Sequence, residues 1–108
     1  MTKHIFTVGL NDKDCEIQII SNDMAVEIIS DIMINQHGVY AFTMNECKGV
    51  YKMDSTNNIV RESSIRIEIV DDSNSDIDYI GIACDMKMAL NQESIMYEVI
   101  NNVNVDFI

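Results

Sequence analysis

Carboxylates are the most concentrated reactive groups in this sequence. Four aspartates lie close together after residue 70, and a fifth follows further along. Such clusters can bind Ca²⁺, but a calcium-binding loop also needs a turn glycine and a terminal glutamate, and this segment has neither at the required spacing. We therefore expect no metal site. A solvated helix start and a surface for a protein partner remain as interpretations. The candidate partner-binding residues are Asp71, Asp72, Asp76, Asp78 and Asp85.

A second set of polar side chains could form a pocket. Its members come from a predicted hairpin and from the turn before the last predicted strand, so the fold could bring some of them together. The alternative is a cross-strand network that stabilises the hairpin. The candidate pocket residues are Glu46, Tyr51, Arg61, Glu62, Gln92 and Glu93.

No motif of a known reaction is present. His4 and His37 have no cysteine or histidine at metal-ligand spacing, and no serine stands in a G-x-S-x-G setting. The three cysteines, Cys15, Cys47 and Cys84, are far apart, and we expect them to be reduced and mostly buried. The sequence therefore predicts a protein that is not an enzyme, without catalytic residues, metal or cofactor.

The charge balance restricts the partners. Seven Lys and Arg against 18 Asp and Glu give a net charge of −11, and residues 71–108 contain only one of the basic side chains. Direct nucleic-acid binding and membrane binding are unfavourable for such a chain, whereas basic protein surfaces attract it. There is no apolar run near 18 residues and no leader segment, so we expect a cytoplasmic protein.

The hydrophobic pattern predicts six elements in one domain, residues 1–108. Ser21 or Asn22 caps the first helix and Gly38 ends it, while Ser75 with Asp78 is a capping signal for the second. We expect Ile77, Ile80, Cys84 and Met88 to form the buried seam of that second helix. In the strand before it, Ile65, Ile67 and Ile69 point to one side. Strands are expected at 4–10, 39–51, 59–70 and from 95, and helices at 24–37 and 77–90.

This order, βαββαβ, predicts an α+β ferredoxin-like fold: an antiparallel sheet with two helices on one face. Four segments form a further pattern: Thr7-Val8-Gly9-Leu10-Asn11-Asp12-Lys13-Asp14, Glu46 with Gly49-Val50-Tyr51, Val60-Arg61-Glu62-Ser63, and Asn91-Gln92-Glu93-Ser94-Ile95. Together they resemble an uncharacterised family of small bacterial, phage and plasmid proteins. The resemblance implies a ferredoxin-like fold and a mobile-element origin, and exported members of that family have leaders that this chain lacks.

Two functional hypotheses follow. The first is a non-catalytic inhibitor that mimics nucleic acid, of the anti-CRISPR or anti-restriction type. Its partner would be the basic surface of a host protein, for example a CRISPR effector nuclease. The alternative is a homodimeric α+β barrel that binds a small molecule or carries an unidentified enzymatic activity, with a pocket lined by the hairpin and Gln92–Ser94.

Overall fold

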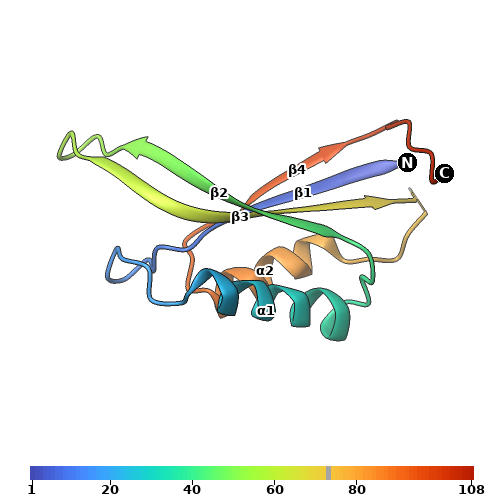
Figure 1. The fold of residues 1–108 in the computed structure, drawn as a ribbon, viewed down its shortest axis with the longest axis horizontal. Helices are drawn as coiled ribbons and strands as arrows, with labels where there is room; N and C mark the ends of the chain where they lie inside the picture. Colours follow the sequence, from blue (N-terminus) through green and yellow to red (C-terminus); the bar gives the residue numbers. More distant parts are fainter. Residues whose placement is uncertain (73) are drawn as a thin grey trace.

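The computed structural model describes residues 1–72 and 74–108, which form one four-stranded sheet and a layer of helices (Figure 1). The strand order is β2-β3-β1-β4, and every neighbouring pair is antiparallel. Both helices cover the same face of the sheet. The expected α+β ferredoxin-like fold is thereby confirmed. The elements are β1 (Thr2–Gly9), α1 (Asn22–Asp31), a π-helical turn η1 (Ile32–Gln36), β2 (Thr43–Lys52), β3 (Ile59–Asp71), α2 (Tyr79–Ala89) and β4 (Met96–Ile100).

The core lies between the sheet and the helices, and the two inner strands, β1 and β3, supply much of its sheet side. Phe6 and Val8 on β1 are fully buried, as are Ile65 and Ile67 on β3. Phe6 pairs with Ile67 and Val8 with Ile65, so these side chains share the face that the helices cover. The alternation of isoleucines along β3 predicted this face correctly.

The first helix begins where the sequence indicates but does not end regularly. The Ser21 hydroxyl accepts a hydrogen bond from the amide of Met24 at 3.2 Å, which is an N-cap. Ala25 and Ile29 are buried against the sheet. The last turn, η1, is wider than an α-helix, and the chain then leaves through Gly38 at φ +69°.

The predicted seam of α2 is wrong. Asp78 caps the helix by accepting a hydrogen bond from the amide of Gly81 at 2.9 Å, whereas Ser75 binds the amide of Ile77 before the helix starts. The buried residues of α2 are Tyr79, Ile82 and Met86. Two members of the predicted seam, Ile80 and Met88, are 63% and 81% exposed, and Cys84 is exposed as well. Both stripes have helical spacing, so the periodicity alone could not select the correct one.

Three smaller predictions also differ from the structure. The strand expected from Val39 begins only at Thr43, and the last strand, expected from residue 95, ends already at Ile100. The tail instead lies beside the N-terminus, where the amide of Val103 binds the carbonyl of Met1. The cysteines are free, as predicted, but none is buried: two are exposed and Cys47 is half-buried. No helix in the described part of the chain is long and apolar enough to span a bilayer.

An aromatic cluster around Tyr79 explains which face of α2 is buried against the sheet. The Tyr79 ring lies parallel to the His4 ring with 3.5 Å between centroids, and Tyr97 stacks on Phe6 at 4.8 Å. His4 Nδ1 and the Tyr97 hydroxyl are 2.6 Å apart, and the Tyr79 hydroxyl donates to Asp71. Burial lowers the pKa of His4 below 6.5, although nearby Asp71 acts in the opposite direction.

The lowered pKa predicts a pH-dependent stability. As the pH falls, the unfolded chain protonates His4 before the folded chain does, so the folded state loses stability below about pH 6.5. We expect His4→Phe, which keeps a ring against Tyr79, to reduce the loss in unfolding free energy between about pH 7.5 and 5.5, measured by urea titration. Equal pH dependence in wild type and His4→Phe would contradict this assignment.

Candidate functional site

The site begins with a difference in strand length. β3 has 13 residues and β1 has eight, and the ladder between them ends at the pair Gly9–Ser64. Residues 59–63 of β3 therefore pair only with β2 and project with it as a hairpin arm beyond the end of β1 (Figure 1). One side of this arm needs cover from other parts of the chain.

A close contact fixes one carboxylate at the base of the arm. The Glu62 side chain lies over Gly9, where a Cβ atom would come within 2.6 Å of Glu62 Oε1. Glu62 Oε2 accepts a hydrogen bond from the backbone amide of Asn11 at 2.9 Å. The absence of a side chain at Gly9 therefore allows Glu62 to reach the loop that follows β1.

The loop after β1 is held in a compact turn. Asp12 accepts hydrogen bonds through Oδ1 from the amides of Asp14 at 2.9 Å and Cys15 at 3.4 Å. The chain reverses through Glu16, which has a φ of 62°, and the amide of Asp12 binds the carbonyl of Ile17 at 2.8 Å. These hydrogen bonds fix the backbone of the short loop that carries the Asp12 and Glu16 side chains.

Two amide side chains join this loop to the turn before β4. Asn91 Nδ2 donates to Asp12 Oδ2 at 2.9 Å and to Asp14 Oδ2 at 2.8 Å. The buried Gln92 donates through Nε2 to the carbonyls of Asn11 at 2.8 Å and Leu90 at 3.1 Å. Segments about 80 residues apart in the sequence are thus fixed side by side.

A cavity of about 510 Å³ lies between the arm, the loop and the turn. This is within the range of about 300 to 1,000 Å³ of small-molecule sites. Four carboxylates and one lysine line it, together with the ring of Tyr51. The lining residues are Gly9, Asn11, Asp12, Lys13, Glu16, Tyr51, Met53, Val60, Glu62, Gln92, Glu93 and Ser94. The arrangement suits a small ligand with positive charge and a flat group.

The pKa of Asp12 is lowered, first by the hydrogen bond from the Asn91 side chain and then by the backbone amide of Asp14. Each of these bonds favours the ionised carboxylate. The Asp12 negative charge therefore persists at pH values where an ordinary aspartate begins to protonate. No group of three or more His, Cys, Asp or Glu side chains in the described residues could hold a metal ion.

The structure brings together four of the six candidate pocket residues, Tyr51, Glu62, Gln92 and Glu93. Glu46 and Arg61 lie elsewhere. Arg61 directly precedes Glu62, and Glu46 is five residues before Tyr51, so both point to the opposite face of the hairpin. Sequence reasoning missed the loop residues that complete the cavity, Asp12, Lys13 and Glu16. The turn pattern after β1 was the available signal, but nothing in it indicates a neighbour at residues 91–94.

The aspartates predicted to bind a partner lie apart from this cavity, and most have local roles. Asp71 accepts from Tyr79, Asp72 Oδ1 from the amide of Asn74 at 3.1 Å, and Asp78 caps α2. Asp85 Oδ2 lies 2.6 Å from His37 Nε2. Asp76 is exposed. The local density of negative charge is therefore explained largely by turns and caps.

Comparison with known proteins shows the fold again. The chain is similar to two solved structures of a phage SAM lyase, one in complex with S-methyl-5′-thioadenosine and one in the apo state. The TM-scores are 0.62 and 0.59, with 23% and 24% sequence identity. Each match covers 91% of this chain and 78% of the lyase chain. No protein-family model matches the sequence, and no curated protein does either.

This finding corrects two expectations. The hypothesis of a non-catalytic nucleic-acid mimic is contradicted, because the two solved structures named above are of an enzyme, a phage SAM lyase. The expectation that the chain is not an enzyme is contradicted for the same reason. The alternative hypothesis, a small-molecule or enzymatic site at the hairpin and Gln92–Ser94, agrees better with both the likeness and the cavity. Its homodimer stays a prediction.

The contact between Asn91 and Asp12 can be tested by NMR. Asn91 has a φ of 47°, so Asn91→Gly removes the amide donor without straining the backbone. We expect the pKa of Asp12 to rise toward its ordinary value, because its main stabilising hydrogen bond is lost. A ¹³C titration of the carboxyl groups would measure it. The lowered pKa of Asp31, due to the Asn35 and Gln36 side chains on α1, should not change and serves as an internal control.

Proposed function

We propose that this chain cleaves S-adenosylmethionine and releases S-methyl-5′-thioadenosine, with the cavity beside the hairpin arm as the substrate site. The observation that carries the proposal is this cavity, which holds several carboxylates and a tyrosine on a fold shared with a phage SAM lyase. We also propose an anti-restriction role in a phage-derived protein. Cleavage would deplete S-adenosylmethionine, and host restriction–modification enzymes that use this compound would then lack it.

The charge of the cavity supports a cationic substrate. S-adenosylmethionine carries a sulfonium and an ammonium group, whereas the carboxylates of Asp12, Glu16, Glu62 and Glu93 line the cavity. A cleft lined mainly by one sign of charge concentrates ligands of the opposite sign. Lys13 is the one cation among the described lining residues and can pair with the substrate carboxylate. The charge pattern therefore matches both ends of the amino-acid portion.

The adenosyl group requires a flat surface. Tyr51 is 49% exposed and lines the cavity, with Met53 and Val60 also on the arm. Aromatic side chains bind nucleobases by stacking, which contributes about 1–3 kcal/mol per base. We assign the adenine to Tyr51 and the amino-acid portion to the carboxylates nearer the loop.

The products define which bond breaks. S-methyl-5′-thioadenosine keeps the methyl and adenosyl groups, so cleavage occurs between sulfur and the γ carbon of the amino-acid portion. The bonding electron pair leaves with sulfur, which becomes a neutral thioether. A lyase adds no water, so the new bond at the γ carbon forms within the four-carbon unit. A carboxylate oxygen of that unit attacks the γ carbon as sulfur leaves, and a five-membered lactone closes without transfer of a proton. The protein's task is to hold a cationic, flexible substrate in the reactive conformation.

Glu62→Gln tests the site directly. We expect kcat/KM for release of S-methyl-5′-thioadenosine, quantified by chromatography, to fall about 100-fold, because a fixed charge at the cationic substrate is removed. Glu46→Gln is the matched control: it changes the same residue type on the same hairpin, but outside the cavity. Wild-type protein that releases no product, or equal losses in both variants, would contradict the proposal.

Gly9→Ala should act through Glu62. The added methyl group would meet the Glu62 carboxylate, which must then leave its position beside Asn11. We expect kcat/KM to fall by a factor similar to that for Glu62→Gln. The midpoint of thermal unfolding should change much less than in a core variant such as Ile67→Ala. In the double variant Gly9→Ala/Glu62→Gln the two losses should not add, because both affect one carboxylate. Additive losses would show that Gly9 acts by another route.

A further inference from the structure

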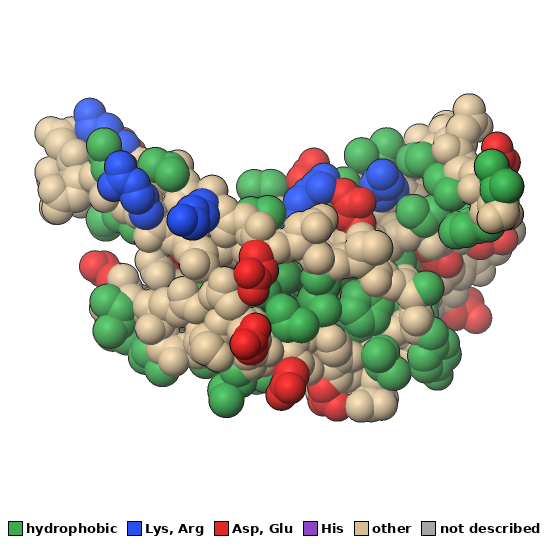
Figure 2. All heavy atoms as spheres, in the orientation of Figure 1, with side chains coloured by type: hydrophobic (Ala, Val, Ile, Leu, Met, Phe, Trp, Pro, Cys, Tyr) green, Lys and Arg blue, Asp and Glu red, His purple; other side chains and the backbone are tan. Residues whose placement is uncertain are grey.

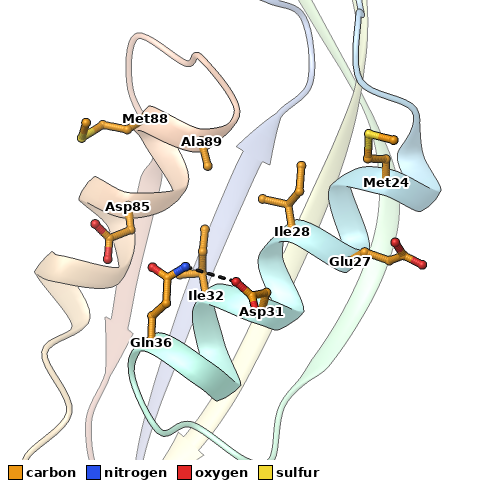
Figure 3. Close-up of a pocket in the computed structure, with 9 residues that line it drawn as sticks. All are labelled: Met24, Glu27, Ile28, Asp31, Ile32, Gln36, Asp85, Met88 and Ala89. Atoms are coloured by element: carbon orange, nitrogen blue, oxygen red, sulfur yellow. Dashed lines mark hydrogen bonds between the residues drawn. The ribbon is translucent and has the colours of Figure 1, made fainter.

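A second hollow lies on the helix layer, between α1 and α2. Figure 3 views it with the sheet behind the helices. Its volume is about 560 Å³, and α1, η1 and α2 supply its lining residues. None of these residues lines the cavity at the hairpin arm. This groove is therefore a separate surface, and its use does not depend on the proposed lyase activity.

The floor and one end of the groove are apolar. Ile28 and Ile32 form part of the floor, and Ala89 faces them from α2 (Figure 3). Met24 and Met88 lie at the same end, one on each helix, and are 55% and 81% exposed. Exposed methionines beside an apolar groove are typical of surfaces that bind other proteins, because the flexible thioether adapts to different partners.

The rest of the rim is acidic. Glu27 and Asp31 on α1 and Asp85 on α2 line the groove, and no lysine or arginine does so in the described part of the chain. The side chains of Asn35 and Gln36 donate to the two oxygens of Asp31 and keep it ionised. The groove thus combines an apolar floor with a rim of three carboxylates, of which Asp85 also contacts His37 Nε2 at 2.6 Å.

We infer that this groove is a docking site for a basic amphipathic helix of a partner protein. A ridge of side chains from a third helix fits between two packed helices, and apolar anchors at i, i+3 or i+4 and i+7 are the usual mode of such binding. α1 and α2 have 10 and 11 residues, so they offer a groove of about 15 Å, or roughly three helical turns. Lysine or arginine beside the apolar anchors of the partner would meet Glu27, Asp31 and Asp85.

A designed peptide tests this inference. The probe is a fluorescein-labelled helix of about 18 residues with leucines at the anchor positions and lysines on both flanks, and its companion has glutamates in place of the lysines. In fluorescence anisotropy with the full chain, we expect the lysine peptide to bind, with weaker binding at high salt, and the glutamate peptide not to bind. Met24→Ser/Met88→Ser and, separately, Glu27→Lys should each weaken binding about tenfold or more.

Matched controls separate the groove from general surface effects. Ile80→Ser/Ile108→Ser removes two apolar side chains that are at least as exposed, and Asp54→Lys reverses an exposed charge on the hairpin loop; none of these residues lines the groove. These variants should change binding by less than about twofold. Three results would overturn the inference: no binding of the lysine peptide, equal binding of both peptides, or self-association in sedimentation that Met24→Ser/Met88→Ser abolishes, which would assign the groove to a second copy of the chain.

Discussion

The length mismatch between the central strand and its neighbour governs the rest of this structure. β1 stops at Gly9 while β3 and β2 continue as an arm, so the sheet ends in a step. No strand lies beside the arm beyond the end of β1. The loop after β1 and the turn before β4 cover this part of the arm instead. The cavity exists because these loops close against the arm without filling it.

Charge is distributed unevenly over the two layers. Figure 2 shows basic side chains on the hairpin arm and, beside acidic ones, along the sheet, whereas the charged side chains over the helix layer below are acidic in this view. Lys48, Lys52 and Arg61 belong to the arm, whereas α1 and η1 contain no lysine or arginine. The net charge of −11 is therefore not spread evenly over the surface of the molecule. In the proposed reaction the sulfonium charge disappears as the thioether forms, so the carboxylates attract the substrate more strongly than the adenosyl product.

The sequence predicted the scaffold better than the site, for a physical reason. Alternation along residues 65–69 and the cap at Ser21 depend on neighbours in the chain, and both were correct. The seam of α2 was wrong because its phase depends on the stacking of Tyr79 on His4, which only the folded chain reveals. The cavity likewise joins Asp12 to Asn91, and no local pattern indicates that contact.

The same limit explains why the aspartate cluster led to a functional hypothesis that did not hold. A carboxylate that accepts hydrogen bonds from its own neighbours keeps its charge but has fewer oxygen lone pairs free to contact a partner, and composition does not report those neighbours. Asp78 is occupied by the start of α2, and Asp71 by the Tyr79 hydroxyl. Glu62 is held by one backbone amide on an edge of the cavity, over a residue without a side chain. A carboxylate that is both oriented and open to a cavity is the kind that binding or catalysis can use, and tertiary contacts decide which carboxylates meet that condition.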